Sequence, residues 1–209
     1  MDMNQYILKF LILAPPLLFA LTLHELAHGY VAWMLGDPTA KNEGRLTMNP
    51  LKHLDPFGVL AFLIANIGWA KPVPVNPTYF KNPQKGMLLV ALAGPGINLL
   101  LAVASALLVK LLIMQPVTSP FLISLLAPAV NMAAASVFIN VMLAVFNCLP
   151  IPPLDGSKVL MGMLPSGAAR SYAQMEPYGF ILVLILFYLG VIGKVIMPIT
   201  QFASGVLLG

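Results

Sequence analysis

The sequence predicts an all-α polytopic membrane protein, built as a bundle of about four transmembrane helices. Two observations carry this prediction: 59% of the 209 residues are hydrophobic, and only 9% are charged. About a quarter of the residues of a soluble domain are charged, so this chain is suited to a lipid bilayer. At this length we expect one compact domain, residues 1–209, whose chemistry lies inside the membrane part.

Four apolar stretches are long enough to cross about 30 Å of hydrocarbon, which takes roughly 20 helical residues. They lie at approximately 7–35, 86–114, 128–149 and 177–197. A fifth run, Phe57–Trp69, is too short to cross, so we expect it to be re-entrant or interfacial. The apolar tail 196–209 can lie at the interface or pack against the bundle.

The basic surplus of the chain indicates its orientation in the membrane. There are 11 Lys and Arg against 7 Asp and Glu, and six of the cations fall between residues 36 and 86. Positive charge gathers in cytoplasmic loops, so we expect 36–85 and 150–176 to face the cytoplasm. This placement argues against a nucleic-acid partner.

The first apolar stretch contains the most informative motif, His24-Glu25-Leu26-Ala27-His28. Residues four apart share one face of a helix, so both imidazoles can reach one metal ion. Glu25 follows the first histidine and can accept a proton from water at the ion, as the general base of zinc proteases does. Three ionisable groups so close together in an apolar helix are costly, which argues against a purely structural role.

A third metal ligand is expected, because catalytic zinc takes three protein ligands and leaves one position for water. Cys148 is the single cysteine, so the ligand must come from His, Asp or Glu. Near the end of the third apolar stretch, prolines at 150, 152 and 153 unwind the helix. Asp155 follows on this unwound segment and is free to point at the metal.

With these motifs the chain resembles the site-2 protease family of intramembrane zinc metalloproteases. The resemblance rests on H-E-x-x-H at 24–28 and on N-x-x-P-x-x-x-L-D-G at 147–156, and it includes Gly94-Pro95-Gly96-Ile97-Asn98 between them. It covers most of the chain and implies a minimal form of the family, without a PDZ domain or a C-terminal sensing domain.

The resemblance also implies roles for single residues. It implies that His24, His28 and Asp155 hold one Zn²⁺ and that Glu25 is the catalytic base. It further implies that Asn147 is catalytic and helps to hold the substrate carbonyl or the oxyanion, although a helix-capping or interhelical role is the alternative. For Asn98, packing is the stronger interpretation, with Gly94 and Gly96 allowing close helix approach and Asn98 bonding across.

The segment 68–77 contains prolines at 72, 74 and 77, so it predicts an extended edge and not a helix. In the resembling family this region forms a small β-type element beside the active site, where a substrate could be held extended. A proline-rich cytoplasmic connector is the alternative. His53 is expected at the surface or interface, with a supporting contact to the metal site as the second possibility.

The implied function is hydrolysis of a peptide bond in or near the transmembrane segment of a membrane protein, as in regulated intramembrane proteolysis. The partners would be this substrate and the lipid bilayer of a prokaryotic inner membrane, with the active site open to the cytoplasm. Two other classes remain: a membrane protein that handles or transports metal with the same ligands, and a catalytically idle scaffold that binds transmembrane helices.

Overall fold

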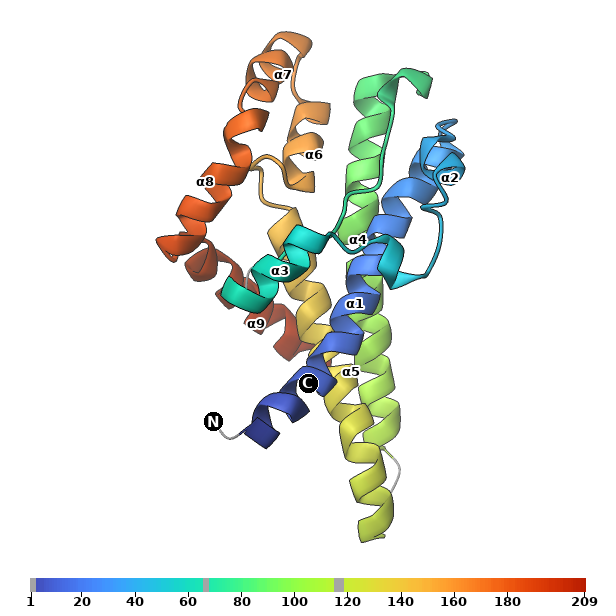
Figure 1. Cartoon of the computed structure of the whole chain (residues 1–209), viewed down its shortest axis with the longest axis vertical. Coiled ribbons are helices and arrows are strands. Elements are labelled where there is room, and N and C mark those ends of the chain that lie inside the picture. The colour runs from blue at the N-terminus through green and yellow to red at the C-terminus, as the bar shows by residue number, and fades with distance from the viewer. Residues whose placement is uncertain (1–2, 66–67, 115–118) are drawn as a thin grey trace.

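The computed structural model describes residues 3–65, 68–114 and 119–209, which are mostly helical (Figure 1). In chain order the helices are α1 (Met3–Met34), α2 (Thr39–Asn42), η1 (Pro50–Lys52), α3 (Pro56–Ala65), η2 (Pro77–Tyr79), α4 (Pro83–Ile113), α5 (Pro120–Asn147), α6 (Asp155–Met163), α7 (Ser166–Ala173), α8 (Glu176–Tyr188) and α9 (Val191–Leu208). Four of these helices are long and apolar enough to cross a membrane: α1 from Ile7 onward, α4, α5 and α9. The predicted all-α polytopic class with four spans is confirmed.

The predicted position of the fourth span, 177–197, is wrong. Helix α8 has only 13 residues and ends at Tyr188, and the spanning helix is α9, which includes most of the apolar tail. Gly190 separates the two helices in a left-handed conformation with φ 70°, which glycine adopts without a Cβ penalty. The third span also starts earlier than expected, because Pro120 occupies a first-turn position of α5, where proline is tolerated.

The short apolar run 57–69 contains α3, a helix of 10 residues that is too short to cross a bilayer. Its side chains include the exposed Phe57, Leu60 and Ile64. The predicted re-entrant or interfacial placement of this run stays a prediction, to which a short apolar helix with exposed side chains is suited.

The predicted small β-type element is not seen as a strand among the described residues. A single isolated bridge pairs Leu54 with Ala70. Residues 71–76, which we call the extended segment, then run outside any helix or strand as an elongated stretch toward η2 (Figure 1). The Lys71 N–H donates to His53 O beside this bridge, but Pro72 and Pro74 have no N–H to donate. The N–H groups of Val73 and Asn76 donate to the carboxylates of Glu25 and Asp37. Neither edge therefore offers the regular donors that a strand ladder requires.

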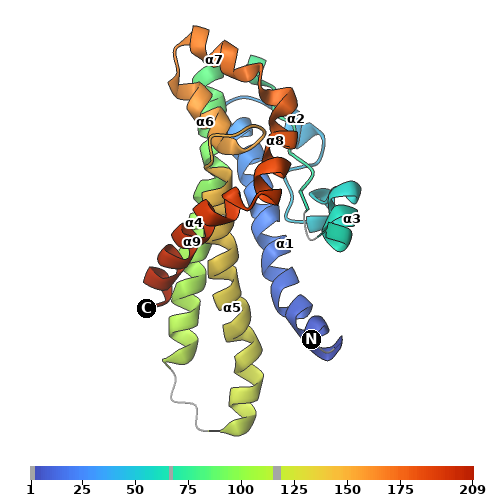
Figure 2. The same cartoon turned by 90° about the vertical axis from the view of Figure 1, so that its left-hand side faces the viewer.

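The centre of the bundle is the antiparallel pair α4 and α5, which α1 crosses and against which α9 packs (Figure 2). Small and β-branched side chains let α4 and α5 approach each other closely: Ala102, Ala106, Val137 and Val141 form one buried cluster. The helices α2, α6 and α7 lie toward the end of this pair where α4 begins, whereas the last turns of α4 and the first turns of α5 lie at the other end (Figure 1). The two loop regions that carry most of the positive charge therefore share one end of the bundle.

Asp37, which follows α1, connects the end of this helix to the extended segment through hydrogen bonds. Its carboxylate is fully buried and accepts hydrogen bonds from the backbone and hydroxyl of Thr39 and, at 2.7 Å, from the N–H of Asn76. Burial alone would raise the pKa of Asp37, but the hydrogen bonds from Thr39 and Asn76 outweigh it and hold the pKa below its ordinary value. The charged form is thus the one that the fold stabilises.

We expect Asp37→Asn to lower the free energy of unfolding by about 1–3 kcal/mol, because an amide NH₂ then faces a donor N–H inside the protein. The native pKa lies below the unfolded value of about 3.9, so the carboxylate stabilises the fold above that pH and loses this effect as the pH falls. Thermal unfolding in detergent at neutral pH and below pH 4 measures both effects. Glu43→Gln, at an exposed position, is the control, and equal stability of the two variants at neutral pH would contradict the assignment.

Candidate metal centre

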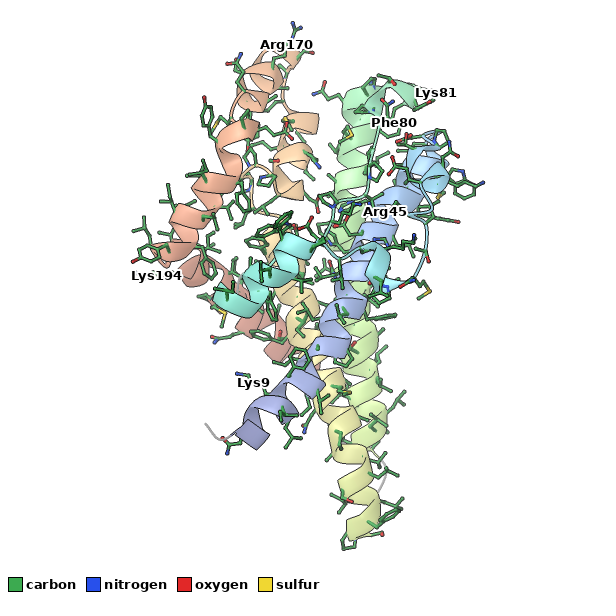
Figure 3. The ribbon with its side chains drawn as sticks, viewed as in Figure 1. Lys9, Arg45, Phe80, Lys81, Arg170 and Lys194 are labelled. Atoms are coloured by element: carbon green, nitrogen blue, oxygen red, sulfur yellow. The ribbon has the colours of Figure 1, made fainter. Side chains whose placement is uncertain are left out.

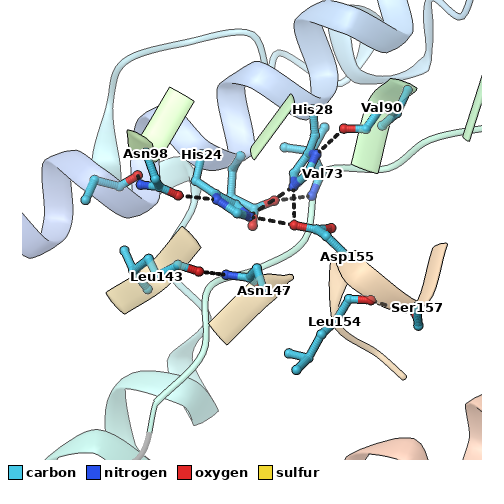
Figure 4. Close-up of polar contacts among 12 residues, drawn as sticks. His24, His28, Val73, Val90, Asn98, Leu143, Asn147, Leu154, Asp155 and Ser157 are labelled. Carbon is cyan, nitrogen blue, oxygen red and sulfur yellow. Dashed lines mark hydrogen bonds and ion pairs between the residues drawn. The ribbon is translucent and has the colours of Figure 1, made fainter. Parts of the chain in front are cut away.

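The two histidines of the H-E-x-x-H motif lie one turn apart on α1, and both are buried, at 6% and 8% exposure. Their Nε2 atoms are 3.0 Å apart. Asp155, the first residue of α6, brings its Oδ2 to 3.1 Å from His24 Nε2 and to 3.2 Å from His28 Nε2 (Figure 4). The three predicted ligands therefore meet at one point, although the histidines and Asp155 lie far apart in the sequence.

Asp155 reaches this point because the chain unwinds between α5 and α6, as its prolines predict. The turn folds back tightly: a Cβ on Gly156 would collide with the backbone of Cys148, so only glycine fits there. The hydroxyl of Tyr172 on α7 donates to Pro150 O at 2.6 Å and holds the turn from the other side. Cys148 itself is exposed.

Both imidazoles are oriented through their second nitrogen. His24 Nδ1 lies 2.6 Å from Asn98 Oδ1, and His28 Nδ1 lies 2.7 Å from the carbonyl of Val90, both on α4. Amide and carbonyl oxygens only accept hydrogen bonds, so each Nδ1 carries a hydrogen and donates it. In the neutral rings, Nε2 then carries a lone pair that points at the shared centre.

The resulting set consists of three acceptor atoms within 3.2 Å of one another, two Nε2 lone pairs and one carboxylate oxygen. Asp155 Oδ2 is buried and receives no hydrogen bond. Such atoms repel unless a cation lies between them. Imidazole and carboxylate suit Zn²⁺, and its tetrahedral ligand atoms stand about 3.3 Å apart, so the residues fit this ion.

Gly94 on α4 makes room for the centre. A Cβ at this position would lie 2.5 Å from His24 Cε1 and from His28 Nε2, whereas a Cβ on Gly96 would meet nothing within 4 Å. The prediction that both glycines allow close approach is confirmed for Gly94 and wrong for Gly96, whose α-carbon faces open space. Asn98 bonds across the helices as predicted, and it is fully buried.

Glu25 lies beside the histidines on α1 and is half-buried. Its Oε2 accepts a hydrogen bond of 2.9 Å from the N–H of Val73 in the extended segment. No side-chain pattern in the sequence points to Val73 or Val90, because their backbone groups make the contacts and side-chain type carries no signal for them. The prolines at 72 and 74 offer a hint, since they leave Val73 as the donor between them.

Asn147 ends α5, and its amide donates to Leu143 O of the same helix at 3.0 Å (Figure 4). The structure shows no hydrogen bond between Asn147 and the three clustered residues, so its catalytic role stays a prediction. His53 is buried, at 1% exposure, and Nε2 bonds to Thr47 O, so the expected surface position is wrong.

The fold and this site together define a class of protein: a helical membrane protein with a buried cluster of two histidines and one aspartate whose atoms fit a metal ion. The sequence model of a protein family, described as Peptidase family M50, matches residues 114–191. Over 171 residues the chain is 44% identical to "Putative zinc metalloprotease YwhC" of Bacillus subtilis (strain 168), covering 82% of this chain and 77% of that protein. No solved structure matches the chain.

A second relative is "Putative zinc metalloprotease Rip2" of Mycolicibacterium smegmatis, which is 31% identical over 186 residues, covering 87% of this chain and 68% of that protein. The chain belongs to peptidase family M50, the site-2 protease family, and the resemblance seen in its motifs is confirmed. It is a zinc metalloprotease and an integral membrane protein.

We expect Gly94→Ala to weaken zinc binding by tenfold or more, because the added methyl group pushes on both imidazoles. Gly96→Ala, two residues along the same helix, is the matched control and should bind zinc as the wild type does. Elemental analysis of the purified proteins measures the zinc content per chain. Equal zinc content in the two variants after dialysis against a chelator would contradict the packing described here.

Proposed function

We propose that this protein hydrolyses a peptide bond in or near the transmembrane segment of a membrane-protein substrate, and that it acts in regulated intramembrane proteolysis. The observation that carries the proposal is the convergence of His24, His28 and Asp155 inside a bundle of apolar helices. A metal site in this position is suited to a substrate that arrives through the bilayer and not from solution.

In the proposed site, His24, His28 and Asp155 hold one Zn²⁺. Zinc bound there supplies Lewis acidity, which makes a water molecule acidic near neutral pH and polarises a carbonyl. Glu25 accepts the proton of the attacking water and passes it to the leaving nitrogen of the cleaved peptide bond. The Val73 N–H holds Oε2 of Glu25, so the other carboxylate oxygen is the one proposed to take the proton.

Asn147 has the proposed role of stabilising the oxyanion. One hydrogen of its NH₂ group serves Leu143 O, and the amide has a second hydrogen to donate. A neutral donor that faces the developing negative charge stabilises the transition state more than the ground state. This contribution would disappear in Asn147→Ala, while zinc would remain bound.

The substrate is proposed to lie extended beside the segment 68–77. A peptide bond inside a helix is shielded, so a transmembrane substrate must unwind locally before water can attack it. The segment is itself extended and is joined to Glu25 through Val73. A substrate held along it would place its backbone next to the proposed base.

The whole chain, residues 1–209, is proposed to act as one membrane-embedded protease domain in a prokaryotic cell membrane, with the active site open to the cytoplasm. Support comes from the distribution of positive charge: Lys81 and Arg170 lie at the end of the bundle that carries α6 and α7 (Figure 3). Arg45 lies on the same loop region as Lys81. Cations gather on the cytoplasmic side of membrane proteins.

Glu25→Gln should retain zinc and lose cleavage, because the amide keeps the shape of the side chain and cannot accept the proton. A loss of roughly 10²–10⁴-fold is expected for a general base. The measurement is cleavage of a panel of single-span membrane proteins by the purified, zinc-loaded variant. Glu43→Gln, at an exposed position, is the control and should cleave normally. Unchanged cleavage by Glu25→Gln would contradict the proposed mechanism.

Asp155→Ala should lose zinc, because it removes the only carboxylate from the cluster of three ligands. Glu176→Ala removes an exposed carboxylate at the start of α8 and serves as the control. Zinc per chain, measured after purification without added metal, separates the two. Undiminished zinc in Asp155→Ala would remove this residue from the ligand set and leave the assignment of the histidines to be tested in His24→Ala.

A further inference from the structure

A chain of buried hydrogen bonds leads from His24 away from the metal centre and into the middle of the bundle. His24 Nδ1 donates to Asn98 Oδ1 at 2.6 Å, and Asn98 Nδ2 donates to Asn140 Oδ1 at 2.8 Å. Asn140 Nδ2 donates in turn to Ser136 O at 2.9 Å. Asn98 is 0% exposed and Asn140 is 1% exposed, so water does not compete for these bonds. The chain joins three spanning helices, α1, α4 and α5.

The direction of every bond in this chain follows from its last member. The backbone carbonyl of Ser136 can only accept, so the NH₂ group of Asn140 must face it and the Asn140 oxygen must face Asn98. The NH₂ group of Asn98 then faces Asn140, and the Asn98 oxygen faces His24. His24 Nδ1 must therefore donate, which leaves the lone pair on Nε2.

Asn98 has a second acceptor in Ala20 O, but that contact is 3.4 Å long, against 2.8 Å to Asn140. Without Asn140, the long contact alone would hold the Asn98 amide, and the amide could turn over. The NH₂ group of Asn98 would then face His24 Nδ1 and require it to accept. The hydrogen of the neutral ring would move to Nε2, which blocks the atom that faces the other two ligands.

Burying two amide side chains costs free energy, which a role in packing alone would not explain. Asn98 and Asn140 lie on α4 and α5, the same two helices whose interface contains Ala102, Ala106, Val137 and Val141. An apolar side chain in their place would pack without a hydrogen-bond requirement. A fully bonded polar chain that ends on a metal ligand is the arrangement found behind metal-binding histidines, whose second nitrogen is held by a partner.

We infer that Asn140 is a positioning residue of the metal centre: acting through Asn98, it fixes the tautomer and orientation in which His24 presents Nε2 to zinc. The inference rests on the proposed role of His24 as a zinc ligand. Asn140 has no hydrogen bond to any of the three ligands, so its effect must pass through Asn98. Asn131 offers a matched control, because it is an exposed asparagine on the same helix.

The test measures the zinc affinity of the apoprotein by competition with a chromophoric chelator. The variants are Asn98→Leu, Asn140→Leu, the double variant, and Asn131→Leu as the control. We expect Asn98→Leu to weaken zinc binding by about 10–100-fold and Asn140→Leu by about tenfold, with Asn131→Leu unchanged. The double variant should bind no more weakly than Asn98→Leu alone, because a residue that acts only through Asn98 has no effect once Asn98 is gone.

Cobalt(II) bound in place of zinc supplies a second measurement. Its visible spectrum reports the geometry of the ligands, so we expect a changed spectrum in Asn140→Leu and the wild-type spectrum in Asn131→Leu. Asn140→Ala removes the same amide with a smaller side chain, and it serves where the leucine variant does not fold. Wild-type affinity and spectrum in a folded Asn140 variant would overturn the inference, as would additive losses in the double variant, which indicate a packing role.

His24→Ala separates this inference from the proposed function. Undiminished zinc affinity in His24→Ala would contradict the ligand assignment, and the inference would fall with it. Lost affinity in His24→Ala together with wild-type affinity in Asn140→Leu would contradict the inference alone. Lost affinity in both, with no further loss in the double variant, is the expected result.

Discussion

The structure depends on one electrostatic constraint: three acceptor atoms of His24, His28 and Asp155 lie within 3.2 Å of one another in the interior of an apolar bundle. Without a cation between them these atoms repel, and their burial keeps bulk solvent from screening the repulsion. The surrounding protein must therefore hold each ligand firmly. Zinc binding would in turn stabilise the fold that gathers the ligands.

His24, His28 and Asp155 are held in place by different local features of the fold. The helical spacing of α1 places the two imidazoles on one face, and the acceptors on α4 orient both rings. The proline turn brings Asp155 back toward the centre, and Tyr172 holds that turn. Because Gly94 has no Cβ, α4 comes close enough to accept hydrogen bonds from both imidazole rings. The site is thus built from α1, α4, the α5–α6 turn and α6 together, and no single element contains it.

The extended segment is part of the same arrangement. Its backbone is joined to side chains of the preceding region, through Glu25 to Val73, Asp37 to Asn76, and Arg45 to Lys71. Prolines remove donors from it, so it cannot complete a ladder with a neighbouring strand. The side chains of Glu25, Asp37 and Arg45 hold its backbone in place, and it lies beside the proposed base for the same reason.

The sequence by itself determined the membrane class, three of the four spans and the three side chains that meet in the cluster of His24, His28 and Asp155. These follow from apolar length, from the i, i+4 spacing of His24 and His28, and from prolines that stop a helix before Asp155, all of which are local properties of the chain. Only the tertiary structure decided the break at Gly190, the absence of a strand among the described residues of 68–77, and the contacts of Val73, Val90 and Asn140. The reason is physical: backbone groups are the same in every residue, and a hydrogen bond between distant segments leaves no local pattern in the sequence.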